Sequence, residues 1–221
     1  MDRVSNMLAP IVLTILSLGD SYTIGEGVKP EERWPVQLAS AMRAMGLEVR
    51  DPQIIARTGW TTDELKNGIQ DSKVEARYDW VTLLIGVNNQ YRGRSDEEYR
   101  TELRAMLHDA IDKAGSNPKR VIVLSIPDWG VTPFAKEKKR DPATIAAELD
   151  AYNRVKREEC EQLGVHFVDI TDISREAGLE DSKLPADRRL LADDGLHPSA
   201  WMYSRWVERV IPIIRKEHGL K

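Results

Sequence analysis

A serine, a histidine and a carboxylate, the parts of an activated hydroxyl nucleophile, occur at informative places in this 221-residue chain. Ser21 follows an apolar run, residues 11–18, and the turn-forming pair Gly19 and Asp20. His197 stands in a loop-like stretch with Asp193 and Asp194 close before it. Gly, Asp and Ser all favour turns, so the segment around Ser21 could also be no more than a turn. The wider pattern decides between these interpretations.

Polar residues and glycines end several strand-like runs. The first run ends at Ser21, the second near Gly59, the third near Asn88, and the fourth near Asp128 and Trp129. In a parallel sheet the carboxyl ends of all strands face one edge, where ligands bind. A backbone N–H at a glycine turn and an asparagine amide are common donors to a developing oxyanion. We therefore expect an acyl-transfer site at this edge.

The elements that position these residues alternate between strand and helix. Apolar residues at helical spacing separate the strand-like runs, which predicts a parallel sheet with helices on both faces. We expect an α/β fold, a three-layer flavodoxin-like sandwich with a central parallel sheet of about five strands, and one domain over residues 1–221. Pro52 suits an edge position for the second strand. The expected strands after the first are residues 49–56, 80–85, 120–126 and 165–170.

Two other features lead to structural expectations. The charged stretch 131–140 is interpreted as a solvated loop. The tryptophans divide into two groups: Trp60 and Trp129 adjoin glycines at the sheet edge and could line the pocket. The others are expected in the core, namely Trp34, Trp80, Trp201 and Trp206.

Composition limits the partners. The net charge of −4 argues against nucleic acid or an anionic membrane as the main partner. The only cysteine, Cys160, cannot form an intramolecular disulfide, and no His, Cys or carboxylate cluster has metal-ligand spacing. We therefore expect no metal. Nothing in the sequence indicates the oligomeric state.

The N-terminal residues resemble the start of a signal peptide, because Arg3 precedes an apolar run over residues 7–18. However, Pro10 interrupts the run, and no Ala-x-Ala-like site separates it from Gly19. The run is also too short and broken to span a bilayer. We therefore expect a cytoplasmic protein without stable membrane insertion.

Taken together, these residues resemble the SGNH hydrolases, also called GDSL-type esterases and lipases. The four sequence blocks of that family occur in order along nearly the whole chain: Gly19-Asp20-Ser21, Gly59, Gly86-Val87-Asn88, and Asp194-Gly195-Leu196-His197. The Gly-x-Ser-x-Gly turn of another hydrolase fold is absent.

The resemblance implies a role for each matching residue. Ser21 would be the nucleophile, His197 the base and Asp194 its orienting acid, in preference to Asp193. The backbone N–H groups of Ser21 and Gly59 and the side chain of Asn88 would form the oxyanion hole.

Two residues differ from the family pattern: Tyr22 replaces the usual Leu and Asn89 the usual Asp. Both are candidates for the substrate pocket, with Trp60 and Trp129. The resemblance implies no cofactor.

The sequence thus predicts a serine esterase that acts through an acyl-enzyme on small or short-acyl carboxylic esters. The family also allows lysophospholipase, thioesterase or carbohydrate O-deacetylase activity. Two alternatives from other classes are phosphoryl transfer with Asp20 as nucleophile and a non-catalytic flavodoxin-like binding module. The first would need a second acid where Tyr22 stands, and the second would not explain the shared position of Ser21, Asn88 and His197.

Overall fold

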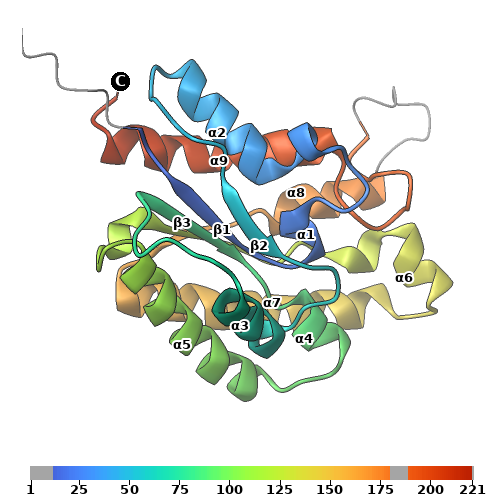
Figure 1. The fold of residues 1–221 in the computed structure, drawn as a ribbon. Coiled ribbons are helices and arrows are strands. Elements are labelled where there is room, and N and C mark those ends of the chain that lie inside the picture. Colours follow the sequence, from blue (N-terminus) through green and yellow to red (C-terminus); the bar gives the residue numbers. More distant parts are fainter. Residues whose placement is uncertain (1–11, 180–188, 221) are drawn as a thin grey trace, which may run out of the picture.

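A computed structural model describes residues 12–179 and 189–220 of the chain. Its fold is a parallel sheet between two layers of helices (Figure 1). The strand order is β2-β1-β3-β4-β5, and every neighbouring pair is parallel. This is the flavodoxin-like order that the sequence predicts. The strands are β1 (Ile15–Gly19), β2 (Gln53–Ala56), β3 (Trp80–Leu84), β4 (Val121–Leu124) and β5 (His166–Val168).

Burial follows strand position. Every residue of β1, β3 and β4 is buried, as expected for strands covered on both faces. β2 is an edge strand with three of its four residues partly exposed, which confirms the expectation drawn from Pro52. Gly19 ends β1 where a side chain would not fit, because a Cβ there would lie 2.4 Å from the carbonyl oxygen of Leu84.

Different helices cover the two faces of the sheet (Figure 1). α2 (Trp34–Ala44) and α9 (Ala200–Glu217) pack together on one face, with α8 (Thr171–Glu176) beside α9. α3 (Thr62–Asp71), α5 (Asp96–Lys113) and α7 (Pro142–Leu163) cover the other face. Short elements complete the described chain: α1 (Ser21–Ile24), α4 (Val87–Tyr91), α6 (Pro133–Glu137), η1 (Pro30–Glu32), η2 (Pro118–Arg120), η3 (Trp129–Val131) and η4 (Ala177–Leu179).

Cap residues fix where the long helices begin. Ser95 accepts a hydrogen bond from the Glu98 N–H at the start of α5, and Asp141 accepts one from the Thr144 N–H at the start of α7. These bonds satisfy backbone donors that have no partner inside the helix. Cys160 of α7 is a buried free cysteine.

Two expectations were wrong. The stretch 131–140 is not a solvated loop throughout, because Thr132 caps α6, Pro133 occupies its first turn and Ala135 is buried. Lys136 and the charged residues after it obscure this helix start in the sequence. Trp201 is 40% exposed, because it lies off the buried stripe of α9 that contains Met202 and Trp206. Trp34, Trp80 and Trp206 are in the core, as expected.

The N-terminal interpretation rests largely on residues 1–11, which lie outside the described part of the chain. Across residues 12–179 and 189–220, none of the helices combines the length and the apolar composition that crossing a bilayer requires.

Candidate active site

The residues predicted for catalysis gather at the carboxyl edge of the sheet. There α1, α4 and α6 lie close to one another, at the right of Figure 1. A cavity of about 140 Å³ opens among them, and Ser21, Gly59, Asn88 and His197 all line it. Ser21, Gly59 and Asn88 share this cavity because β1, β2 and β3 end at one edge, and the segment before α9 adds His197.

Ser21 is the first residue of α1 and lies directly after the turn that ends β1. The side chain of Asp20 caps this helix by accepting a hydrogen bond of 3.0 Å from the Tyr22 N–H. The N–H groups of Gly25 and Glu26 both donate to the Ser21 carbonyl and close the short helix. Ser21 is thus held at the cavity by bonds of its own segment.

His197 is fixed by Asp194. Nδ1 of the imidazole lies 2.6 Å from Oδ2 of Asp194, and the N–H groups of Leu196 and His197 donate to Oδ1 at 2.9 Å. Partial burial would raise the pKa of Asp194, but the hydrogen bonds from His197 and these backbone groups outweigh it and lower the pKa below its ordinary value. Asp194 therefore stays ionised beside the imidazole. All three of these bonds come from Asp194, and the neighbouring Asp193 is exposed.

With Nδ1 bonded to Asp194, Nε2 of His197 is the ring nitrogen left to exchange a proton with another group. Nε2 lies 3.9 Å from a carboxylate oxygen of Glu26, and that oxygen also accepts a hydrogen bond from the Thr58 hydroxyl. The ring of Tyr22 meets the imidazole edge-on with centroids 5.7 Å apart. The imidazole is thus oriented from two sides.

Asn88 and Gly59 flank Ser21 on neighbouring segments. The Asn88 amide donates to the Trp60 carbonyl at 2.9 Å, which orients the amide and leaves its second hydrogen for another acceptor. Gly59 has φ +84°, a left-handed conformation that favours glycine. Arg92 secures the same turn by donating to the Gly59 carbonyl at 2.7 Å. The arrangement could present an amide and a backbone N–H to one oxyanion.

Replacing Asn88 by alanine is expected to lower kcat by about 100- to 1000-fold, the loss typical of one oxyanion donor. Because the interaction forms only in the transition state, kcat/KM should fall by the same factor while KM stays nearly constant. Steady-state kinetics on a small ester measures both. Asn117→Ala is the matched control, since Asn117 caps η2 at the opposite edge of the sheet. A rise in KM with unchanged kcat would contradict the assignment.

Of the four residues expected in the substrate pocket, two line the cavity and two do not. Tyr22 and Trp129 line the cavity, and both are nearly fully buried. Trp60 and Asn89 do not line it. The Trp60 ring covers Gly68, where a Cβ would come within 2.1 Å of it, so only the Trp60 carbonyl serves the site. The sequence shows which residue is near the edge but not which of its atoms faces the cavity.

Asn89 instead joins α4 to the start of α3. Its carbonyl accepts from the Thr62 N–H at 3.1 Å, and its amide donates to the Thr62 hydroxyl at 2.6 Å. That hydroxyl donates in turn to Glu102 of α5. A side chain that both donates and accepts is needed here, which explains an amide where the family usually has a carboxylate.

Asn89→Asp should therefore lower the free energy of unfolding by about 1–3 kcal/mol, the cost of an unsatisfied buried group. The new carboxylate still accepts from the Thr62 N–H but can no longer donate to the Thr62 hydroxyl. It also stands beside Glu102, whose oxygen is 3.4 Å from the Asn89 amide nitrogen. Urea unfolding should show a lower midpoint at constant slope. Adding Glu102→Gln should restore part of the loss, because an amide can donate to the new carboxylate. An unchanged midpoint in Asn89→Asp would contradict this account.

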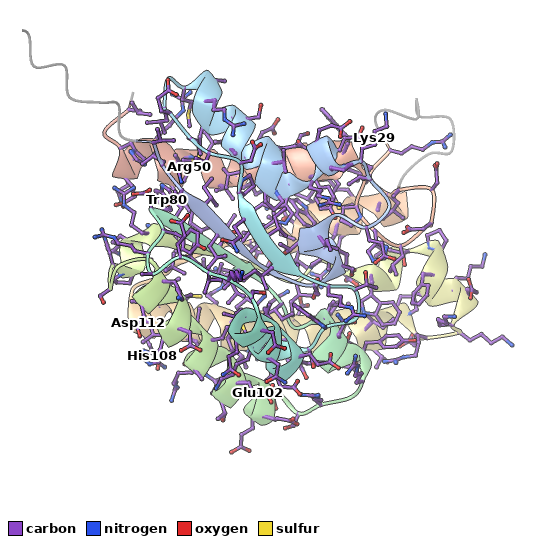
Figure 2. All side chains as sticks on the ribbon, in the orientation of Figure 1. Lys29, Arg50, Trp80, Glu102, His108 and Asp112 are labelled. Atoms are coloured by element: carbon purple, nitrogen blue, oxygen red, sulfur yellow. The ribbon has the colours of Figure 1, made fainter. Side chains whose placement is uncertain are left out.

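The other histidines lie away from the cavity. His108 is exposed on the outer side of α5 (Figure 2). His218 accepts a hydrogen bond from Trp80 at the amino end of β3, the edge opposite Ser21. His166 begins β5 at the same amino edge. None of the three lines the cavity.

The sequence analysis missed three residues that line the cavity, Thr58, Tyr91 and Phe134, and also Glu26, which lies beside His197. Two features of the sequence could have indicated Tyr91 and Phe134. Tyr91 stands three residues after Asn88, one helical turn away on the same face. Phe134 directly follows Thr132-Pro133, a cap and proline pair like Asp141-Pro142 at the start of α7.

The fold and the cavity define the class of protein: an α/β protein with a serine, a histidine and a carboxylate at the carboxyl edge of its sheet. The model of the GDSL-like Lipase/Acylhydrolase family matches residues 17–205. The chain belongs to this family, and the protein is therefore a hydrolase.

Solved structures agree on the fold. One match is TesA, with a TM-score of 0.66 and 18% identity over 92% of this chain and 98% of the other. The lipase/acylhydrolase from Enterococcus faecalis has a TM-score of 0.68 and 20% identity over 93% of this chain and 96% of the other. A variant of Axe2, an acetyl xylan esterase from Geobacillus stearothermophilus, has a TM-score of 0.66 and 20% identity over 91% of this chain and 94% of the other. No curated protein sequence matches this chain.

Proposed function

We propose that the protein hydrolyses small carboxylic esters through an acyl-enzyme on Ser21. The observation that carries the proposal is the 2.6 Å contact between Asp194 and Nδ1 of His197, which leaves Nε2 for the cavity that Ser21 also lines. A carboxylate that orients an imidazole beside a serine is the arrangement that activates a hydroxyl nucleophile.

In the first half-reaction, His197 Nε2 takes the proton of the Ser21 hydroxyl while Oγ forms a bond to the ester carbonyl carbon. The carbonyl oxygen becomes negative and accepts hydrogen bonds from the N–H groups of Ser21 and Gly59 and from the Asn88 amide. When the carbonyl re-forms, the bond to the alcohol oxygen breaks. Nε2 then gives its proton to that oxygen, and the alcohol leaves.

In the second half-reaction a water molecule gives a proton to His197 Nε2 and its oxygen attacks the acyl carbonyl. The same donors hold the second tetrahedral intermediate. Its collapse breaks the bond to Ser21 Oγ, which takes the proton back from Nε2, and the carboxylic acid leaves. Asp194 stabilises the imidazolium in both halves.

Cavity size supports a short acyl group. An engineered cavity of about 150 Å³ holds one benzene molecule, so the 140 Å³ here suits an acyl group of about that size. A series of p-nitrophenyl esters from acetate to palmitate tests this directly. We expect kcat/KM to be highest for acyl groups of two to about six carbons and to fall for longer chains. Hydrolysis of palmitate as fast as of acetate would contradict the short-acyl proposal.

Removal of acetyl groups from carbohydrates is the nearest alternative, because an acetyl group fits the same cavity. The acetyl xylan esterase among the similar structures supports testing it, although the likeness itself concerns the fold. Release of acetate from acetylated xylo-oligosaccharides faster than from p-nitrophenyl acetate would favour it.

Phosphoryl transfer by Asp20 is disfavoured by burial. Asp20 is fully buried and does not line the cavity, and one of its oxygens is occupied by the Tyr22 N–H. Burial raises the pKa of Asp20 to about 7, which weakens it as a nucleophile. We expect EDTA to leave esterase activity unchanged. Loss of activity in EDTA with recovery in Mg²⁺ would bring this alternative back.

A further inference from the structure

Three aromatic side chains from separate elements form one side of the cavity. Tyr91 of α4, Trp129 of η3 and Phe134 of α6, together called the aromatic wall, all line it with Ser21 and His197. Tyr91 and Trp129 meet edge-on with centroids 5.5 Å apart, and Trp129 and Phe134 do so at 6.0 Å. Edge-to-face contacts of this kind are a favoured packing of aromatic rings.

The wall is held from behind by a polar chain. The Trp129 indole N–H donates to Gln90 at 2.9 Å, and the Gln90 amide donates to Glu148 of α7. Arg140 lies 3.5 Å from Glu148 and places its guanidinium 5.6 Å from the Trp129 ring centre. Trp129 is only 2% exposed, so it is fixed before any substrate binds. A preformed wall loses little conformational freedom on binding.

The charge around the wall argues for a neutral guest. Lys138 Nζ lies 5.0 Å from the ring centre of Phe134, and Arg140 stands by Trp129. These two cations would repel a cationic group beside the wall, and the Glu26 carboxylate, 3.9 Å from His197 Nε2, would repel an anionic one. A neutral flat ring could add further aromatic contacts, and the cavity has the volume for one six-membered ring.

Strand order shows on which side of Ser21 the wall lies. Along the carboxyl edge, Thr58 follows β2, Ser21 follows β1, Tyr91 follows β3, and Trp129 follows β4. The leaving alcohol must be near His197 Nε2, which is 3.9 Å from Glu26, the partner of Thr58. The loop of His197 also contacts α6, where the Phe134 N–H donates to the Gly195 carbonyl at 3.2 Å, but Nε2 itself faces Glu26. An alcohol bound beside Nε2 would lie toward β2, and the acyl group would then extend toward β3 and β4.

We infer that this enzyme prefers esters whose acyl part carries a neutral aromatic ring, such as phenylacetyl, and that the aromatic wall selects that ring. The inference rests on the proposed function and specifies its substrate class. Arylacetyl groups are favoured over saturated rings of the same size, because only the flat ring makes edge and face contacts with Tyr91, Trp129 and Phe134.

Matched esters test this without changing the chemistry of the carbonyl. Ethyl phenylacetate and ethyl cyclohexylacetate differ only in the ring, and the methylene insulates the carbonyl from it. We expect kcat/KM to be about 2- to 12-fold higher for phenylacetate, the range that aromatic pairs add beyond their area burial. Benzyl acetate and cyclohexylmethyl acetate, which place the ring on the alcohol, should differ by less than about 2-fold.

Variants assign the preference to the wall. Phe134→Leu and Tyr91→Leu should each reduce the ratio of phenylacetate to cyclohexylacetate toward one. Phe167→Leu is the matched control, because Phe167 lies on β5 and does not line the cavity, and it should keep the ratio. If Phe134→Leu unfolds, Tyr91→Leu still gives the test, since Tyr91 is 43% exposed.

The outcomes separate the inference from the function on which it rests. A ratio of one, or a preference for the saturated ring, in an active enzyme would overturn the inference and leave the esterase proposal intact. A preference only in the alcohol-side pair would overturn the assigned side. A folded protein that hydrolyses none of the four esters would overturn the proposed function, and the inference would fall with it.

Discussion

Ser21→Ala is expected to lower kcat for ester hydrolysis by about a million-fold, the loss seen when the nucleophile of a catalytic triad is removed. Without Oγ no acyl-enzyme forms, and only the oxyanion donors and substrate binding remain to assist water. A discontinuous assay with high enzyme concentration and long incubation can measure the residual rate. The side chain lies at the cavity and not in the core, so the variant should keep its fold.

Ser17→Ala is the control for this experiment. Ser17 lies on the same strand, β1, and accepts a hydrogen bond from Thr82 at 2.9 Å in the interior of the sheet. Its loss should reduce stability and leave kcat nearly unchanged. A normal rate in Ser21→Ala would refute the mechanism, and an equal loss in Ser17→Ala would show that strand packing, not the nucleophile, sets the rate.

Asp194→Asn should lower kcat by about 10,000-fold, less than the loss of Ser21. The amide can replace the carboxylate sterically, but its NH₂ group favours the tautomer of His197 with the proton on Nε2. That nitrogen can then no longer accept the proton of Ser21. The pH dependence of the residual rate should differ from that of the native enzyme, since hydroxide can replace the missing base.

Asp193→Asn removes the same charge from the neighbouring position. Asp193 is exposed, whereas the bonds to His197 and to the Leu196 N–H come from Asp194. The control should therefore keep its rate within a few-fold. If the two variants lost the same factor, local charge and not orientation of the imidazole would explain the effect, and Asp194 would not have the role assigned to it.

The fold was predictable because its signals are local. The apolar run before Gly19 is buried on both sides, as β1 is, and Pro52 correctly indicated an edge strand. The three-residue spacing from Asp194 to His197 also holds, since one carboxylate bonds both the ring and the backbone of the turn. In these cases the residues that interact are close in the sequence, or are placed by the strand order.

The walls of the cavity were harder to predict because they depend on side-chain direction between distant segments. Trp60 and Trp129 both adjoin glycines, yet only Trp129 lines the cavity, because the Trp60 ring packs over Gly68. Asn89 was expected at the pocket and instead bonds Thr62 across two helices. Phe134 was hidden by the charged residues that follow it. Contacts of this kind have no periodic signature in a single sequence.

The most direct test of the central claim is mass spectrometry of the intact protein and its peptides after treatment with a fluorophosphonate. We predict one adduct, located on Ser21, that is lost in His197→Ala although Ser21 is still present. Such a result would show a serine activated by this histidine. A folded protein without an adduct, or one modified at another residue, would contradict the assignment of Ser21 as nucleophile and with it the proposed esterase mechanism.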